Sequence, residues 1–550
     1  MDNTVVVLGG GIGGMSAALE LAERGFNVYV FELKRIPGGK SRTIPVPNSG
    51  TGGRPDLPGE HGFRFFPSFY VHLPDTMKRI PLGNTGRTCF DNLVPTTRIE
   101  LAQYDLAGIL ALSGFPKNLQ DLEVIIADLF ANIGLRPGEA EFFAARIWQV
   151  MTSCDERRLN QLEQLSWWDY VGAATRSPAY QKFLAQGLSR SLVAARAEDG
   201  SARTIGQIQV RLAFGAIDPE EPSTDRVLNG PTSPALLDPW LKYLTSQRVK
   251  YLRPYNVTSI QTSGGRIVSV NVLNLDDHTE TTVKADWFIS ALPVEVMGPL
   301  ITDDMVQLDP ALSYVRTLAT NVRWMNGIQF YLTEDVPVIN GHVLYVDSPW
   351  AITSISQPQF WPGYPLPNYG DGKVKGLISV DISDWDKPGT FIKQAAKDCD
   401  NRDQIAKEVW EELKKSLNVG GKVLLRDDML HSWFLDTDII IFDPMRPRKD
   451  INLEPLFINR PNSWAVRPPA ASAISNFFLA ADYVQTNSDL ACMEAANEAA
   501  RRAVNALLDR AGSPASRCRI WDMGMPEIFA PWRWNDQLRY WEGKPWDGEL

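Results

Sequence analysis

The stretch Thr4-Val5-Val6-Val7-Leu8-Gly9-Gly10-Gly11-Ile12-Gly13-Gly14 decides how the beginning of this chain folds. A β-branched apolar run enters a glycine turn, and residues 15–22 continue it as an alanine-rich amphipathic helix. Gly9, Gly11 and Gly14 stand in the G-x-G-x-x-G register. In that register the first glycine makes the turn, the second lets a pyrophosphate approach the backbone, and the third lets helix and strand pack closely. The stretch therefore predicts a strand, a turn and a helix whose N-terminus binds a dinucleotide.

A second strand, predicted over residues 26–32, supports this interpretation because it ends in an acid, Glu32. A carboxylate at that position accepts hydrogen bonds from the ribose hydroxyls of a dinucleotide. Gly38 and Gly39 follow, flanked by Lys40 and Arg42. Paired glycines with nearby cations suit a loop that folds over a pyrophosphate, and a solvated turn is the alternative.

Composition and charge exclude several classes of protein. The chain has 550 residues, which is too long for one compact core, so we expect two or three domains. The net charge of −10 without a basic run argues against a nucleic-acid partner. The five cysteines and five histidines show no metal-ligand spacing, so no metal site is predicted. With no apolar stretch of membrane-spanning length and no targeting segment before Thr4, a reduced, cytoplasmic protein is expected.

The middle of the chain divides into a helical and a strand-rich part. Helical spacing of apolar residues predicts helices over 119–131, 140–151 and 179–194. The apolar run 106–115 is interpreted as a buried helix. A segment that contacts lipid is the alternative. Further on, a strand at 249–260 leads to a hairpin turned at Gly264 and Gly265. Period-two patterns predict strands over 326–332, 341–346, 376–382 and 431–442, interrupted by a long helix over 391–417.

Several motifs taken together resemble a known family. They are the glycine turn, Glu32, the Gly39-Lys40 turn, the segment Glu60-His61-Gly62-Phe63-Arg64, and a strand that ends in Ala481-Asp482 before a helix from Met493. In this order they resemble the superfamily of FAD-dependent amine oxidases and phytoene desaturases. Stretches 60–67, 230–240, 348–361 and 476–503 are most similar to hydroxysqualene dehydroxylase-like flavin desaturases, which are associated with squalene and carotenoid synthesis.

The resemblance implies FAD as the cofactor. Carried over residue by residue, the cofactor-binding positions are Gly9, Gly11, Ile12, Gly13, Gly14, Glu32, Leu33, Gly39, Lys40, Gly62, Phe63, Arg64, Val257, Ala291, Asp482 and Met493. In the family the segment at Gly62–Arg64 runs beneath the isoalloxazine ring. The helix from Met493 points its N-terminus at the pyrimidine edge, where reduced flavin carries negative charge.

The expected fold is α/β, with a discontinuous Rossmann-type FAD-binding domain and a substrate domain of mixed sheet plus helical lid. We assign residues 1–71, 222–300 and 455–511 to the FAD domain, 72–221 to the helical lid, and 301–454 to the sheet-containing substrate region. Residues 512–550 form a tail with five tryptophans. We expect the tail to pack on its own protein; an oligomer interface or a peripheral membrane contact is the alternative.

The resemblance implies hydride exchange between flavin N5 and a lipophilic isoprenoid or polyene, by desaturation or reductive dehydroxylation. Two alternatives stay open: an amine or amino-acid oxidase that uses O₂, and a non-redox isomerase or hydratase that uses flavin. Arg64 is the first candidate catalytic residue beside the ring, and Trp350 is a candidate pocket wall. Asp347 and Asp436 are candidate acid/base groups if a hydroxyl leaves as water.

Overall fold

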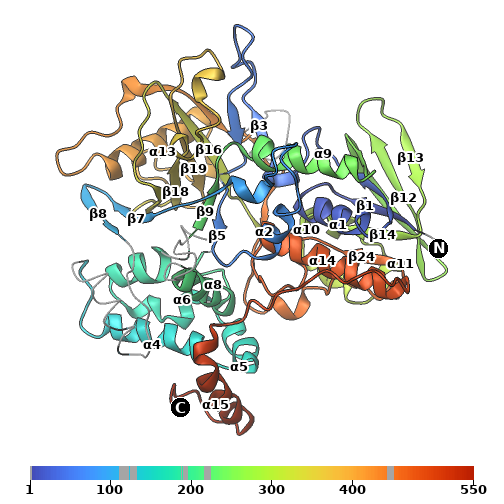
Figure 1. Cartoon of the computed structure of the whole chain (residues 1–550). Coiled ribbons are helices and arrows are strands. Elements are labelled where there is room, and N and C mark those ends of the chain that lie inside the picture. Colours follow the sequence, from blue (N-terminus) through green and yellow to red (C-terminus); the bar gives the residue numbers. More distant parts are fainter. Residues whose placement is uncertain are drawn as a thin grey trace.

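The computed structural model describes residues 3–441 and 451–550, apart from residues 63, 111–119, 121–122, 124–132, 188, 190–195 and 216–224. Three parts are visible in Figure 1: a nucleotide-binding part around a parallel sheet, a part built on a large mixed sheet, and a helical part near the C-terminus. Among the described residues, no helix combines the length and the apolarity that crossing a bilayer requires.

The nucleotide-binding part is a five-stranded parallel sheet assembled from three distant pieces of sequence. Its order is β10 (Lys250–Leu252), β2 (Asn27–Phe31), β1 (Thr4–Leu8), β14 (Trp287–Ser290) and β24 (Phe477–Leu479). Helices α1 (Ile12–Ala22) and α14 (Met493–Arg510) pack against each other beside this sheet. The Rossmann-type, discontinuous fold predicted from the sequence is therefore confirmed, whereas the exact domain boundaries stay a prediction.

The central strand β1 explains why the opening run is apolar without alternation. Val5, Val6, Val7 and Leu8 are all fully buried, because both faces of a parallel sheet are covered. Burial of each of these side chains contributes about 1.5–3 kcal/mol. The predicted hairpin is also present: β11 (Tyr255–Ser263) and β12 (Arg266–Asn274) are joined through Gly264 and Gly265, which take φ values of +60° and +78°. Strand β13 (Glu280–Val283) completes this three-stranded antiparallel sheet.

The mixed-sheet part is built on a seven-stranded sheet. Its order is β20 (Leu430–Leu435), β16 (Asn326–Leu332), β19 (Gly376–Ile382), β18 (Ile352–Ser356), β17 (Gly341–Tyr345), β7 (Arg98–Gln103) and β8 (Leu106–Leu110). One face packs on α13 (Arg402–Leu417), whose side chains Ile405, Val409, Trp410 and Leu413 are buried in the shared core. Figure 1 shows α13 beside this sheet, at a distance from the helical part. Ile99, Leu101 and Leu344 of the sheet belong instead to the core of the helical part.

Two predicted helices need correction. Residues 106–110 form strand β8, not a buried helix, because Leu106 pairs with Gln103 across a tight hairpin in which Asp105 has φ +58°; residues 111–115 lie outside the described residues. The long helix predicted over 391–417 begins only at Arg402, because the Asn401 side chain caps it by accepting a hydrogen bond from the Gln404 N–H at 3.0 Å.

The helical part contains α4 (Glu139–Thr152), α5 (Asp155–Asn160), α6 (Trp167–Tyr170) and α8 (Ala202–Gly215). The helix predicted over 140–151 is therefore confirmed. The one predicted over 179–194 is a π-helical segment over Tyr180–Gly187, beyond which most residues lie outside the described part. Almost all of the predicted helix 119–131 lies outside it as well.

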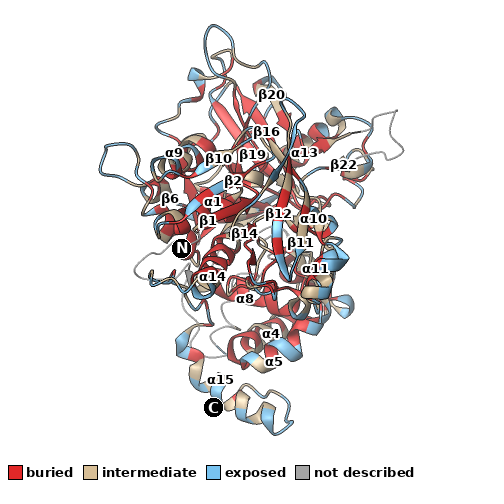
Figure 2. Cartoon of the chain, turned by 90° about the vertical axis from the view of Figure 1, so that its right-hand side faces the viewer, coloured by how far each residue is buried: buried red, intermediate tan, exposed pale blue. Residues whose placement is uncertain are grey.

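The tail ends in α15 (Ala530–Trp541), which extends from the helical part and carries many exposed residues (Figure 2). Trp532 and Trp546 pack on the helical core, and Asp536 pairs with Arg157 at 2.9 Å. The tail thus packs partly on its own protein, as expected.

The remaining described elements are short. They are helices α2 (His72–Met77), α9 (Asp238–Ser246), α10 (Val294–Leu300), α11 (Asp303–Leu308) and α12 (Leu312–Leu318), and strands β3 (Thr43–Pro45), β4 (Pro58–Glu60), β5 (Phe66–Pro67), β6 (Leu93–Pro95), β9 (Asp225–Leu228), β15 (Val322–Arg323), β21 (Ile439–Ile440), β22 (Ile451–Asn452) and β23 (Leu456–Phe457). Strands β5, β9 and β6 form a small antiparallel sheet that connects the nucleotide-binding part with the helical part.

Candidate FAD and substrate site

A cavity of about 490 Å³ lies at the carboxyl ends of the parallel strands. Gly9, Glu32, Ala291 and Ala480 directly follow β1, β2, β14 and β24, and all four line it. In open α/β sheets, ligands bind outside the carboxyl ends of the strands, where the strand order reverses. That point lies between β1 and β14 in this sheet. The cavity therefore lies where the sequence predicts the binding site.

Most of the predicted cofactor-binding residues line this one cavity. They are Gly9, Gly11, Ile12, Gly13, Glu32, Leu33, Gly39, Lys40, Gly62, Arg64, Val257, Ala291, Asp482 and Met493. Phe63 lies outside the described residues. Gly14 lies behind the lining, and a Cβ there would come within 1.9 Å of the Gly9 carbonyl oxygen. Gly14 thus serves close packing of helix on strand, and the contacts of the other residues with FAD stay a prediction.

Glu32 is held in place by the backbone around it. Its two carboxylate oxygens accept hydrogen bonds from the Gly10 and Lys34 N–H groups, each at 2.7 Å. Burial raises the pKa of this carboxyl, and the two N–H donors counteract that effect. Each oxygen has a further lone pair for a hydroxyl of a bound ribose.

The two cations of the glycine turn are already paired. Lys40 lines the cavity, and its Nζ lies 2.6 Å from Oε1 of Glu295. Arg42 is buried outside the lining, where it pairs with Asp438 at 2.6 Å and Glu454 at 2.8 Å. This corrects the idea that Arg42 reaches a pyrophosphate: its guanidinium instead fixes the turn to the 436–454 segment.

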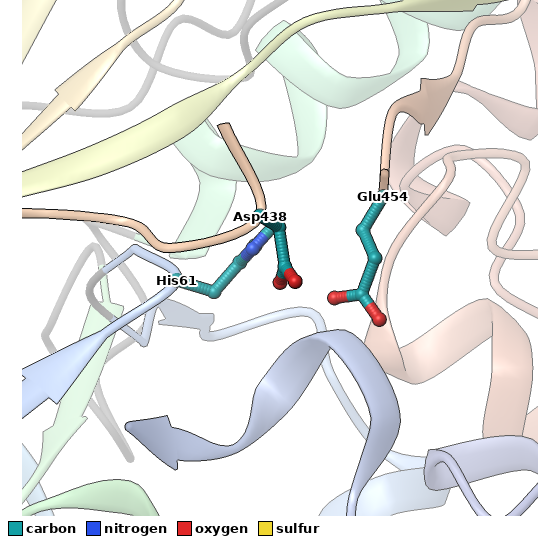
Figure 3. Close-up of side chains that lie close together, drawn as sticks. All are labelled: His61, Asp438 and Glu454. Atoms are coloured by element: carbon teal, nitrogen blue, oxygen red, sulfur yellow. The ribbon is translucent and has the colours of Figure 1, made fainter. Parts of the chain in front are cut away.

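His61, Asp438 and Glu454 come together at the edge of the cavity (Figure 3). One nitrogen or oxygen from each lies within 4.8 Å of the others, a spacing that a metal ion could use. However, Arg42 pairs with both carboxylates, and Lys34 lies 3.0 Å from Asp438 and 3.4 Å from Glu454. Because these two cations already balance the two carboxylates, we interpret the group as an ion-pair network.

The cations of the network lower the pKa of Asp438. Burial raises the pKa of Asp438, but the positive charge of Arg42 outweighs it and holds this pKa well below its usual range. Asp436, two residues earlier, is fully buried and lies 2.6 Å from Nδ1 of His61. Asp436 therefore supports the His61 ring from behind and does not itself reach the cavity.

The second helix N-terminus at the cavity belongs to α14. Cys492, Met493 and Ala496 line the cavity at its start, opposite the first turn of α1. Both helices present their first N–H groups and the positive ends of their dipoles to the same space. Asp482 contributes a carboxyl nearby, and burial raises its pKa.

Of the predicted catalytic residues, the structure brings only Arg64 to the cavity. Its Nη2 donates to the Lys40 carbonyl oxygen at 3.3 Å and lies 3.6 Å from Oε2 of Glu60. Trp350 is instead fully buried in the core on the α13 side, where its Nε1 donates to the Lys387 carbonyl. Asp347 pairs with Lys182 and accepts from the Tyr104 N–H. Neither Trp350 nor Asp347 lines the cavity, which corrects both predictions.

The sequence did not single out the polar wall that the mixed sheet contributes. His342, Thr353 and Asp381 come from the adjacent strands β17, β18 and β19, and all three line the cavity. Their neighbours along the strands, such as Val343 and Ile382, point into the core under α13. The alternation of side chains along each strand therefore predicts that the strand has two different faces. It does not predict which of the two faces lines the cavity.

The cavity continues away from the nucleotide-binding part. A narrow space of about 60 Å³ shares Met325, Ser383 and Leu456 with it. A third space, of about 450 Å³, shares Arg323, Trp324 and Ser383 with the narrow one. Ser383 lines all three spaces, so they adjoin one another between the glycine turn and β15; we call the smallest the narrow passage and the third the outer chamber.

These residues fit an FAD molecule. A Cβ on Gly11 would meet only Gly38 and Gly39 at 3.8–4.0 Å, so the turn is bare on its cavity side. Two helix N-termini suit the pyrophosphate and an electron-rich ring, and Glu32 suits a ribose. The fold and the site thus define a flavin-dependent oxidoreductase.

Comparison with known families agrees with this assignment. Residues 7–80 match the NAD(P)-binding Rossmann-like domain, and residues 245–508 match the flavin-containing amine oxidoreductase family. These two regions of the chain are thus similar to a nucleotide-binding domain and to the flavin-containing amine oxidoreductase family. The protein is an enzyme of the flavin oxidoreductase class, with FAD as its cofactor.

Similar solved structures share the fold at low sequence identity. Cyclohexylamine oxidase from Brevibacterium oxydans IH-35A is 12% identical with a TM-score of 0.58, covering 93% of this chain and 100% of that one. A putative protoporphyrinogen oxidase from Exiguobacterium sp. 255-15 is 15% identical with a TM-score of 0.57, covering 93% and 100%. Hydroxyneurosporene desaturase from Rhodobacter capsulatus is 46% identical over 46 residues, which is 8% of this chain and 9% of the desaturase. The chain is similar to the two oxidases in architecture and to the desaturase over one short stretch, and its substrate needs a separate argument.

Proposed function

We propose that this enzyme uses FAD to oxidise or reduce a long, mainly apolar substrate of the isoprenoid or polyene class. The observation that carries the proposal is the set of three adjoining spaces. A long chain can lie with one end at the flavin and the other in the outer chamber. A small amine would need only the first space.

The chemistry of the narrow passage supports an apolar chain. Most of its exposed lining is apolar and comes from residues such as Ile205, Trp324 and Phe457, and Thr204 and Asn459 are among its polar residues. Such a wall favours hydrocarbon, because a polar group inside it would lose its hydrogen bonds with water. Methionine and aromatic side chains also adapt to an irregular chain.

Charged residues stand at the outer end of the passage. Arg196 pairs with Asp384 at 2.6 Å, and Arg323 lies 3.3 Å from Asp199. Because these cations are balanced by acids, they give the outer chamber a polar rim without a strong net field. A polar rim around an apolar passage suits a substrate that is apolar along most of its length.

The chain's own residues supply binding, orientation and exclusion of water. FAD, when bound, accepts or donates a hydride at its reactive ring, which is the chemistry the protein need not provide. The N-terminus of α14 would stabilise negative charge that develops on a bound flavin, and Arg64, which lines the same cavity, would add a positive charge. The passage holds the reacting carbon of the substrate close to the ring and keeps water out.

A blocking variant tests the proposal. Met325→Trp fills the narrow passage, and Val423→Trp is the matched control because Val423 is 62% exposed. Purified proteins with bound FAD are mixed without oxygen with long-chain isoprenoids or polyenes, and the flavin absorbance is followed. We expect the wild type and Val423→Trp to bleach at equal rates and Met325→Trp to bleach at least about 10-fold more slowly.

The same assay separates the alternatives. Bleaching by small amines, with peroxide released when air is readmitted, would assign an amine oxidase and overturn the proposal. Turnover of an isoprenoid with no net change of flavin absorbance would assign a non-redox isomerase or hydratase. Equal rates in Met325→Trp and the wild type would show that the passage does not hold the substrate.

A further inference from the structure

His342 and Asp225 form a buried pair in the wall of the cofactor cavity. His342 on β17 is 1% exposed, and Asp225 at the start of β9 is completely buried. Nδ1 of His342 lies 2.6 Å from Oδ2 of Asp225. The ring lines the cavity and the carboxylate does not, so the ring stands between the carboxylate and the ligand space.

The surroundings fix both groups. The Thr96 hydroxyl donates to Oδ1 of Asp225, and the Thr96 N–H donates to the Asp225 carbonyl at 3.0 Å. The Phe65 ring, which also lines the cavity, meets the His342 ring edge to face with centroids 5.3 Å apart. Phe65 follows Arg64 in the segment that the family resemblance places beneath the flavin. The His342 ring is therefore held on the same wall as the predicted flavin contact.

A carboxylate at Nδ1 determines what the other ring nitrogen can do. At 2.6 Å the two atoms form an ion-pair contact without hydrogen-bond alignment, and the negative charge beside Nδ1 favours the neutral tautomer that has its proton on Nδ1 and its lone pair on Nε2. We propose that His342 is the proton acceptor of the reaction and that Asp225 is its positioning residue. This inference rests on the proposed oxidation of an apolar chain at the flavin.

The step balances as follows for a desaturation. One C–H bond of the substrate is broken with its electron pair, and hydride leaves to the oxidised FAD. The C–H bond on the adjacent carbon then breaks heterolytically, its electron pair forms the C=C bond, and its proton goes to Nε2 of His342. The substrate loses one hydride and one proton, and FAD is the two-electron oxidant.

The other histidine–carboxylate pairs in the described part of the chain are less suited to this role. His72 uses both ring nitrogens, near Glu494 at 2.8 Å and as acceptor from the Trp521 N–H at 3.0 Å. His431 pairs with Asp371 outside the cavity lining. His61 lines the cavity, but its ring is surrounded by acids: Asp436 lies 2.6 Å from its Nδ1, and oxygens of Asp438 and Glu454 lie within 4.8 Å of one of its nitrogens.

The test uses His342→Gln, which keeps a polar side chain of similar length but accepts no proton, and Asp225→Asn, which removes the carboxylate charge. His431→Gln is the matched control. With a polyene that the wild type turns over, we expect flavin reduction to be at least about 100-fold slower in His342→Gln and roughly 10-fold or more slower in Asp225→Asn. FAD affinity should change less than about 2-fold in both.

A second readout is independent of activity. The chain has five histidines, so ¹⁵N spectra of histidine-labelled protein without FAD contain few ring signals. The signal lost in His342→Gln should show the Nδ1-protonated tautomer in the wild type, and it should shift in Asp225→Asn. If His342→Gln does not fold, the ring signal that shifts in Asp225→Asn and that variant's rate decide the question.

The outcomes separate this inference from the proposed function. A wild type that no polyene reduces would overturn the proposed function, whereas the tautomer measurement would still stand. A wild type that is reduced, with His342→Gln or Asp225→Asn reduced equally fast, would overturn only the role of the pair. An Nε2-protonated ring in the wild type would overturn it as well.

Discussion

Replacing Gly14 by alanine should reduce the stability of the protein, whereas replacing Gly11 by alanine should reduce its affinity for FAD. At Gly14 a Cβ would lie 1.9 Å from the Gly9 carbonyl oxygen, whereas real Cβ atoms do not come closer than 3.0 Å. At Gly11 the nearest protein atoms would be 3.8 Å away, and its φ of −71° suits alanine. Gly14→Ala therefore perturbs the protein itself, and Gly11→Ala perturbs only the space for the cofactor.

The magnitudes follow from these distances. In Gly14→Ala, helix and strand must separate by about 1 Å, which costs about 3 kcal/mol because the clash is with rigid backbone. In Gly11→Ala, the stability without FAD should stay within about 1 kcal/mol of the wild type. Its FAD dissociation constant should rise at least about 10-fold, which corresponds to about 1.4 kcal/mol, because the methyl group enters the expected pyrophosphate position.

The assay combines urea unfolding without FAD and titration with FAD. Gly363→Ala is the control, because nothing lies within 4 Å of a Cβ at that position. Unchanged FAD affinity in Gly11→Ala would refute the placement of the pyrophosphate at this turn. Wild-type stability in Gly14→Ala would refute the close packing of α1 on β1.

The other predictions concern the ion-pair network, the core and the tail. Arg42→Met leaves the buried carboxylates without their main cation, so the free energy of unfolding, measured with urea, should fall by about 3–5 kcal/mol. Adding Asp438→Asn should restore part of this loss, because it removes one of the unpaired charges. Because the folded-state pKa of Asp438 is lowered, its ionised carboxylate contributes to the free energy of unfolding fully above about pH 4, and this contribution is lost as the pH falls further. If the wild type and an Asp438→Asn variant lost stability in parallel below about pH 4, this prediction would be wrong. Trp350→Phe should destabilise the protein by about 1–3 kcal/mol while the rate of flavin reduction stays unchanged, and a selective loss of rate would return Trp350 to the site. Trp534→Ser should leave thermal stability unchanged because Trp534 is 66% exposed, whereas Trp546→Ala should lower it; the reverse order would show that the tail packs differently.

The correct and the wrong predictions differ in the range of the interactions that decide them. The turn at Gly9–Gly14 and the acid Glu32 depend on backbone geometry within one strand–turn–helix unit, so neighbouring residues are sufficient to predict them. Arg42 was misjudged because its partners, Asp438 and Glu454, are far away in the sequence. The residues around Arg42 in the sequence do not show that two distant carboxylates neutralise its charge, and only the folded chain brings them together.

The mixed sheet shows the same limit more clearly. The strand at residues 326–332 was predicted with its exact bounds, but Trp350 and Asp347 were assigned to the site from residue type alone. Alternation gives each strand two faces, and the packing of α13 decides which of them is core. Trp350 lies on the core side, and His342 lies on the other.

By itself, the sequence determined that this protein binds a dinucleotide on a Rossmann-type sheet, because each part of that signature is a local arrangement of backbone and side chain. The segments at Gly62, Val257 and Asp482 extended it to FAD through their order along the chain. Only the tertiary structure decided which residues share the cavity and how far it continues beyond the glycine turn. The pairing of His342 with Asp225 and the passage at Met325 arise from contacts between distant segments, and no local pattern records which segments will meet.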